Sequence, residues 1–231
     1  MNKMKILLSV DAHGEILKVN EKVDLILIAG DFAKGDKLRK MIFEGGSQEE
    51  AKEEIIDSSK KFLNELIKLK CPIVASLGNA EEFARNEIIN LMKEKGIIYC
   101  NRKCINLKGL DIVCLDFFVE KWWAEKYKPD NKGTQERAND DEKNLKNCFK
   151  KIKKADIILS HLPPWEILDI NPAPPEFIKS YIGHMGSKIL KQAIIKIKPR
   201  LVVCGHIHIP GEVDFEGTRI INPGKATIIE F

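Results

Sequence analysis

Short runs of consecutive apolar residues recur along the chain, and each run is bounded by polar or turn-forming residues. Runs this short and this continuous are typical of strands that are buried on both faces of a sheet. They predict buried strands at residues 6–10, 25–29, 73–76, 112–118, 157–160 and 201–204.

Several segments between these runs have apolar residues at helical spacing. Ser47 and Glu50 have the spacing of a capping box at a helix N-terminus, and apolar positions continue from there to Leu69. Further helices are predicted at residues 81–95 and 135–153, and from Ser187 to Pro199, because proline cannot continue a helix.

The end of the chain changes to a hairpin pattern. Residues 211–215, 218–222 and 226–231 are predicted to be short antiparallel strands, with a tight turn at Glu216-Gly217. Two long ordered loops are predicted, at 119–133 and at 162–186, and loops of this length in a compact domain are usually functional. The first contains Trp122 and Trp123. Three roles are open for these two side chains: stacking on a base, forming a hydrophobic lid, or packing within the loop.

Composition narrows the class of protein. With 231 residues, 44% of them hydrophobic and 31% charged, the chain is expected to form one globular domain over residues 1–231, neither disordered nor membrane-spanning. The net charge of +4 comes from 38 basic and 34 acidic residues, which are mixed along the chain, so nucleic acid is not implied as a partner.

The cysteines and the N-terminus predict a cytoplasmic protein. Six cysteines are present without zinc-ribbon spacing, Cys100 and Cys104 being the nearest pair, and we interpret them as free thiols in a reducing compartment. The apolar run near Met1 is too short for a signal peptide and leads directly into Asp11-Ala12-His13, so we interpret it as the first strand.

Potential metal ligands follow five of the predicted strands. They are Asp11, His13, Asp31, Asn79, His161, His206 and His208. In open α/β sheets ligands bind beyond the carboxyl ends of the strands, so these side chains are expected to meet at one edge. Carboxylate, amide and imidazole ligands without thiolate suit borderline divalent ions, and one carboxylate can bridge two ions about 3.5–4 Å apart.

Each of these motifs has a structural interpretation when taken alone. Gly30-Asp31 is a common turn, Asn79 has the position of a helix N-cap, and His161 precedes a proline-rich loop. The ordered set of five motifs favours the metal site.

This ordered set resembles the calcineurin-like metallophosphoesterases. Their pattern of Asp-x-His, Gly-Asp, Gly-Asn, His and Gly-His-x-His runs here from Asp11 to His208, and Asn222-Pro223-Gly224 resembles the family's closing turn. The resemblance implies an α/β fold, a four-layer αββα sandwich of two mixed β-sheets flanked by helices. It also implies two divalent ions, one held by Asp11, His13, Asp31 and His208, the other by Asp31, Asn79, His161 and His206.

The function implied is a metal-dependent phosphoesterase, with phosphodiesters favoured and a metal-bridging hydroxide as the nucleophile. The expected cofactors are two divalent transition metal ions, of manganese, iron, zinc or nickel, with manganese favoured, and the expected partner is a small phosphoester substrate. Two alternatives remain open. One is a non-catalytic protein-interaction scaffold on the same fold, and the other is a nuclease of the same superfamily.

Two positions depart from the family pattern. Ala80 stands where many members have a histidine that assists the leaving group, although an acidic residue, Glu81, follows it, and Lys225 replaces a frequent serine. The remaining histidine, His184, precedes the helix predicted at Ser187, whose amides favour anions. We therefore predict that His184 and Ser187 bind the substrate, and that Asn79 and His184 are catalytic. A loop histidine without a role is the alternative for His184.

Overall fold

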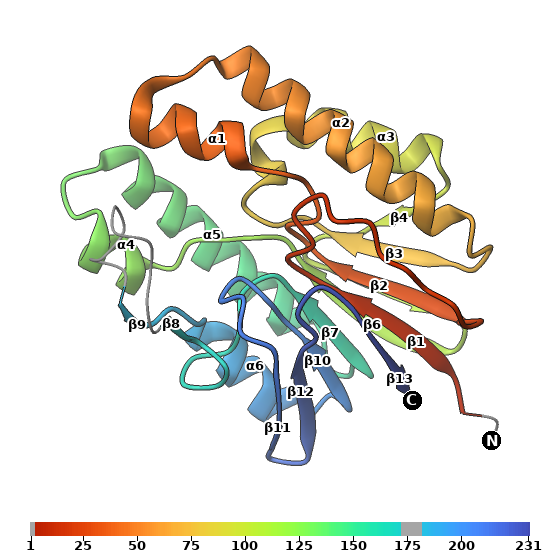
Figure 1. Ribbon diagram of the computed structural model, residues 1–231. Coiled ribbons are helices and arrows are strands. Elements are labelled where there is room, and N and C mark those ends of the chain that lie inside the picture. The colour runs from red at the N-terminus through yellow and green to blue at the C-terminus, as the bar shows by residue number, and fades with distance from the viewer. Residues whose placement is uncertain (1–2, 172–181) are drawn as a thin grey trace.

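The computed structural model describes residues 3–171 and 182–231. Two mixed β-sheets pack face to face, and helices cover the outer face of each sheet (Figure 1). In spatial order, the first sheet contains β13 (Thr227–Glu230), β1 (Lys5–Ser9), β2 (Leu25–Ala29), β3 (Ile73–Ser76) and β4 (Ile98–Tyr99). The second contains β11 (Gly211–Phe215), β12 (Thr218–Asn222), β10 (Leu201–Val203), β7 (Ile157–Ser160), β6 (Leu110–Leu115) and β5 (Lys103–Leu107). This is the four-layer αββα sandwich that was expected.

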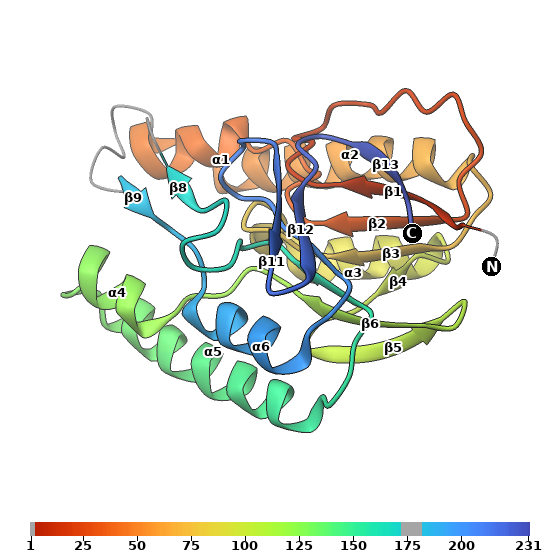
Figure 2. The same ribbon diagram turned by 90° about the horizontal axis from the view of Figure 1, so that it is seen from below.

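Helices form the two outer layers, which lie on opposite sides of the paired sheets in Figure 2. The layer on the first sheet contains α1 (Asp36–Lys40), the π-helical turn η1 (Met41–Gly45), α2 (Gln48–Ile67), the 3-10 turn η2 (Glu81–Ala84) and α3 (Arg85–Glu94). The layer on the second sheet contains α4 (Lys121–Tyr127), α5 (Lys132–Lys151) and α6 (Lys188–Ile197). A separate two-stranded ribbon pairs β8 (Ile170–Asn171) with β9 (Gly183–His184).

The inner strands are buried on both faces, which explains their continuous apolar runs. In β1, Ile6 and Leu8 pack between the two sheets, while Leu7 packs with the helices of the outer layer. Successive side chains of a strand point to opposite faces, so a strand between two layers needs an apolar residue at every position.

Strand direction places the site. β1, β2 and β3 run parallel to one another in the first sheet, and β6, β7 and β10 do so in the second. The carboxyl ends within each sheet therefore lie at one edge, where the loops that carry the predicted ligands begin.

Most predicted elements are confirmed, and Ser47 caps its helix as predicted, because its side chain accepts a hydrogen bond from the Glu50 amide. The prediction of a loop at 119–133 was wrong, since α4 forms there and packs on α5 through Ala124 and Ala138. The predicted loop at 162–186 contains β8 and β9, and its residues 172–181 lie outside the described residues. The predicted strand at 112–118 ends earlier, at Leu115.

Two further expectations can be compared with the structure. All six cysteines are free thiols. No helix within residues 3–171 and 182–231 has the length and apolar character needed to span a bilayer.

Candidate metal centre

The seven predicted ligands come together at the shared edge of the two sheets. Each follows the carboxyl end of a parallel strand, namely β1, β2, β3, β7 or β10. They form two adjoining groups that have Asp31 in common.

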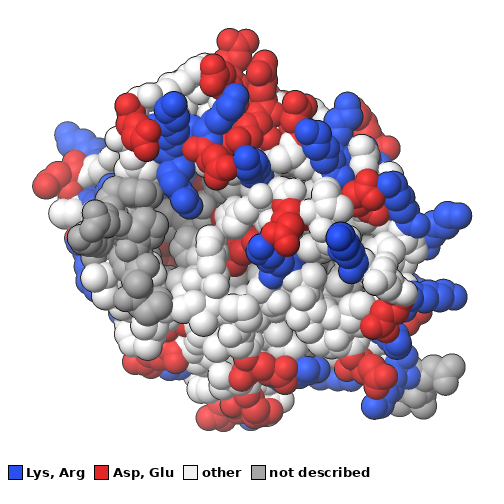
Figure 3. All heavy atoms as spheres, in the orientation of Figure 1, with Lys and Arg blue, Asp and Glu red and all other residues white. Residues whose placement is uncertain are grey.

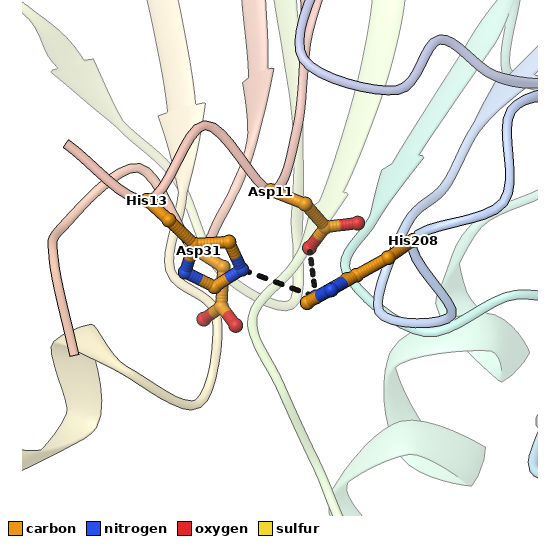
Figure 4. Close-up of side chains that lie close together, drawn as sticks. All are labelled: Asp11, His13, Asp31 and His208. Atoms are coloured by element: carbon orange, nitrogen blue, oxygen red, sulfur yellow. Dashed lines mark hydrogen bonds and ion pairs between the residues drawn. The ribbon is translucent and has the colours of Figure 1, made fainter. Parts of the chain in front are cut away.

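The first group consists of Asp11, His13, Asp31 and His208, and Figure 4 shows these side chains converging from three loops. One ligand atom from each lies within 4.8 Å of the others. The Nε2 atoms of His13 and His208 are 3.1 Å apart, and His208 Nε2 lies 3.7 Å from Asp11 Oδ1. Asp11 Oδ1 is buried and has no hydrogen-bond partner among the described residues. A cation between these donors would satisfy that oxygen and both ring nitrogens, so the residues present fit a divalent ion.

The second group is built around the amide oxygen of Asn79. Asn79 Oδ1 lies 3.0 Å from His161 Nε2 and 3.1 Å from His206 Nδ1, and His161 Nε2 lies 3.7 Å from Asp31 Oδ2. His161 Nδ1 is 2.9 Å from the Ala29 carbonyl, to which it donates, and this leaves the Nε2 lone pair directed at the site.

Burial sets the protonation of His206 and His208, whereas at His161 the charges of Asp31 and Asp11 outweigh burial and raise the pKa. Burial lowers the pKa of His206 to about 3 and that of His208 to about 4, so at neutral pH both rings are neutral and offer the lone pair that a metal ion requires. Burial raises the pKa of Asp11 to about 7, against the attraction of His161. Burial acts in the same direction on Asp31, but the charges of His161 and His13 outweigh it and lower the pKa.

Glu81 holds the two central loops together. Its carboxylate is fully buried and accepts hydrogen bonds from the amides of Asp31 at 2.8 Å, Ala33 at 2.7 Å and Gly78 at 2.8 Å. The Ala80 amide in turn donates to Asp31 Oδ1 at 2.8 Å. The carboxylate shared by the two groups is therefore fixed from both of its neighbouring loops.

The Gly30-Asp31 and Gly78-Asn79 loops approach so closely that each needs its glycine. Gly30 has a φ of +84°, and a Cβ there would lie 2.2 Å from the Gly78 nitrogen. A Cβ on Gly78 would lie 2.1 Å from Asp31 Oδ1. Either side chain would force apart the two loops that carry Asp31 and Asn79.

Five of the seven predicted ligands have a strained backbone conformation. Left-handed φ values occur at Asp11 (51°), His13 (46°), Asp31 (49°), His206 (71°) and His208 (58°). For residues other than glycine this region costs about 1–2 kcal/mol each. Strain of this kind persists where surrounding structure enforces it, and it clusters at functional sites.

A cavity of about 550 Å³ opens beside both groups. His13, Asp31, Asn79, His206 and His208 line one end of it. Figure 3 shows this face hollowed below α1, with positive and negative side chains interspersed around it. The remaining lining is largely apolar and includes Trp122 and Trp123, so the tryptophans singled out in the sequence face the cavity from α4.

Ser187 lies at the predicted start of a helix, but its side chain is engaged by other groups of the protein. It is 1% exposed, caps α6 by accepting a bond from the Leu190 amide, and donates its own proton to Glu120. Glu120 also accepts bonds from the amides of Lys188 and Ile189. A protein carboxylate thus occupies the anion position at this helix N-terminus, so the predicted contact of Ser187 with the substrate is replaced by its bond to Glu120.

His184 lies on β9, next to the cavity-lining Met185 and Gly186 but not itself on the lining. Its Nδ1 is 2.8 Å from Asp169 Oδ1, and its ring packs at 5.0 Å on Trp165. The ring is oriented by the buried carboxylate of Asp169.

Sequence reasoning missed Arg39. It is the single Lys or Arg among the described residues that line the cavity, and within the described part of the chain its guanidinium has no hydrogen bond or ion pair. Burial is the main reason that the pKa values of His13 and His208 are lowered, and Arg39 lies close enough for its charge to lower both further. The short helix α1 that carries it has no buried residue, and hence no apolar pattern to predict it.

A two-sheet α/β sandwich with acidic and histidine side chains at the carboxyl ends of its parallel strands defines a metallophosphoesterase architecture. A model of the family described as calcineurin-like phosphoesterase matches residues 6–210, and the chain belongs to this family. No curated protein matches the sequence.

Solved structures share the fold at low sequence identity. One crystal structure aligns with a TM-score of 0.68 and 14% identity, covering 99% of this chain and 95% of its own. The phosphopantetheinyl hydrolase PptH from Mycobacterium tuberculosis aligns with a TM-score of 0.60 and 12% identity, and the alignment covers 95% of this chain and 88% of PptH. The protein TT1561 of Thermus thermophilus aligns with a TM-score of 0.58 and 16% identity, and the alignment covers 97% of this chain and 90% of TT1561. Likeness at this level of identity concerns the fold alone.

Proposed function

We propose that this metal-dependent phosphoesterase uses two divalent transition metal ions, with manganese favoured, and acts on phosphodiesters. The observation that carries the proposal is the pair of adjoining ligand groups that share Asp31. Asp11, His13, Asp31 and His208 would hold one ion, and Asp31, Asn79, His161 and His206 the other.

The two ions would supply a hydroxide nucleophile near neutral pH and neutralise charge on the phosphoryl oxygens. The chain's own residues fix where this happens. Glu81 and the Ala80 amide hold the Asp31 carboxylate, and the Ala29 carbonyl holds the His161 ring. Arg39 lines the same cavity and is placed to bind a phosphoryl oxygen.

The balance of charge in the cavity supports a diester. A diester carries one negative charge and a second organic group, whereas a monoester dianion calls for more cationic donors. Apart from the ligand groups, Arg39 is the one basic residue in the described lining, where Asp36 and Glu120 also lie. The apolar remainder of the lining suits an organic group.

Neither alternative function has comparable support. A non-catalytic scaffold gives no reason for seven converging ligand side chains, five of which have a strained backbone. A nuclease surface calls for a basic stripe, and on the face drawn in Figure 3 acidic and basic side chains are interspersed.

Asp31→Asn tests the proposal, with Asp36→Asn as a matched control. Asp36 lines the same cavity but pairs with Lys34 at its surface and belongs to neither ligand group. We expect Asp31→Asn to lose bound metal and most hydrolysis of bis(p-nitrophenyl) phosphate, and Asp36→Asn to keep both. Metal content is measured by mass spectrometry, and activity before and after chelation. Purified protein without stoichiometric transition metal, together with activity that survives chelation, would refute the proposal.

A further inference from the structure

Two large apolar side chains are exposed beside the metal-ligand groups. Ile42 is 59% exposed and Phe43 is 48% exposed, and both line the cavity from η1. Leaving apolar area in water forgoes about 25 cal/mol per Å². Exposed apolar surface gathered in a concave site is a mark of ligand binding.

The facing wall of the cavity is aromatic and comes from the other helical layer. Trp122 and Trp123 line it from α4, which lies across from α1 and η1 in Figure 1. The Trp122 ring is fixed edge-to-face against Trp165, with centroids 4.6 Å apart, and Lys188 Nζ lies 5.3 Å from the Trp122 ring centroid. A wall held in this way needs little reordering when a ligand binds.

Phe117 connects this apolar region to the ligand groups. Its ring also lines the cavity and lies 5.6 Å from the His206 ring and 6.0 Å from the His161 ring. Its amide donates to the Leu77 carbonyl at 2.8 Å, which anchors it to the loop that leads to Asn79. A phosphoryl group at the ligand groups would therefore place its organic substituent against an aromatic surface.

We propose that the site takes a phosphoester whose organic group is a flat aromatic ring, seated between Phe43 and the α4 tryptophans next to Phe117. This inference rests on the proposed phosphoesterase function and names its substrate class. The cavity of about 550 Å³ lies within the range of small-molecule sites, ~300–1,000 Å³. Aromatic walls favour aromatic ligands, because ring pairs gain offset-stacked or edge-to-face attraction beyond the area that they bury.

Titration calorimetry with phosphonates in the presence of Mn²⁺ isolates the organic group. Methyl-, cyclohexyl- and phenylphosphonate carry the same anionic head and differ only in the substituent. We expect phenylphosphonate to bind about 10-fold more tightly than methylphosphonate, as expected for burying one ring, and more tightly than cyclohexylphosphonate. Comparing thymidine 5′-phosphate with ribose 5-phosphate then separates the sources of the ring. A preference for the former identifies a nucleobase, and a phenyl preference alone identifies a simpler aryl group.

Phe43→Ala locates the effect, and Ile195→Ala is its control. Ile195 is 46% exposed on α6 and does not line the cavity. Both changes remove an exposed apolar side chain, so neither should unfold the protein. Phe43→Ala should reduce the phenyl-to-methyl ratio several-fold while leaving the Kd of methylphosphonate within about 2-fold, and Ile195→Ala should leave the ratio unchanged.

The outcomes separate this inference from the function on which it rests. Metal-dependent hydrolysis of bis(p-nitrophenyl) phosphate together with equal Kd values for methyl- and phenylphosphonate would overturn the aromatic substrate class alone. A phenyl preference lost in Phe43→Ala, in a protein without metal-dependent hydrolysis, would overturn the phosphoesterase function and retain aromatic recognition. A preference that Phe43→Ala leaves intact would overturn the placement of the ring.

Discussion

Replacing Glu81 by glutamine should both destabilise the fold and weaken metal binding. The side chain is fully buried, and its two oxygens accept three backbone amides from the loops that carry Asp31 and Gly78. A glutamine has one oxygen and one NH₂ group, so whichever way it is oriented at least one of these amides faces another donor. The substitution keeps size and shape, and hence tests the hydrogen bonds and not the packing.

The magnitude follows from these bonds. If the glutamine oxygen takes the place of Oε2, it keeps the Asp31 and Gly78 amides and leaves the Ala33 amide unpaired in the interior. A hydrogen bond to a charged group contributes about 1.5–3 kcal/mol, one between neutral groups about 0.5–1.5, and an unsatisfied buried donor costs about 1–3. We expect a loss of about 3 kcal/mol in the free energy of unfolding. In a chain of this size that corresponds to a fall of about 6–12 °C in Tm.

Metal affinity should fall as well, because the Asp31 loop is no longer held at its amide. Loss of a residue that orients metal ligands typically costs about 10–100-fold in affinity. The measurements are thermal unfolding of the metal-free protein and calorimetric titration with Mn²⁺, both at pH 9. Burial raises the pKa of Glu81 to about 8, so at pH 9 the wild-type side chain is a carboxylate.

Glu82→Gln is the matched control. Glu82 stands on the same 3-10 turn and pairs with Arg137 at 2.7 Å, near the surface. Partly exposed pairs of this kind contribute about 0.2–1 kcal/mol. The lower end of the cost of an unsatisfied buried donor is about 1 kcal/mol. The reasoning would fail if Glu81→Gln lowered the free energy of unfolding by less than this and left the affinity for Mn²⁺ unchanged. The hydrogen bonds from the three amides would then not be what holds the site.

Three further changes test other parts of the site. Arg39→Gln should raise KM about 10-fold with little change in kcat, as expected for the loss of one hydrogen bond to a charged group. The neighbouring Lys40→Gln is the control and should change neither constant. Equal constants for both variants would refute the role of Arg39. The wild type should strongly prefer aryl over alkyl leaving groups, and Ala80→His should raise kcat on alkyl esters, since a general acid contributes about 10²–10⁴ in rate; comparable wild-type rates on both classes would contradict this. His184→Ala should retain its full metal content yet lose roughly 10-fold in kcat/KM. This loss is smaller than the loss of a general acid usually causes, because the ring lies beside the cavity and not on its lining. Loss of metal in that variant would make His184 a ligand, and unchanged kcat/KM would leave it a loop histidine.

The sequence by itself determined the buried inner strands and which residues follow their carboxyl ends, but not β4, β5, β8 or β9. Doubly buried strands need apolar side chains at every position, so they stand out as continuous runs. Parallel strands end at a common edge, so the motifs from Asp11 to His208 could be expected to meet. The cap at Ser47 was also predictable, because its partner Glu50 is only three residues away.

The tertiary structure alone decided how the site is held and what surrounds it. In the sequence, Glu81 looks like an exposed acidic residue at the start of a helix. In the structure it is buried and accepts hydrogen bonds from backbone amides 48 and 50 residues away. Ser187 was predicted to leave amides open for phosphate, but Glu120, 67 residues earlier, occupies them. Contacts between such distant residues leave no periodic pattern in a sequence. They arise only once the two sheets have packed and brought their loops within hydrogen-bonding distance.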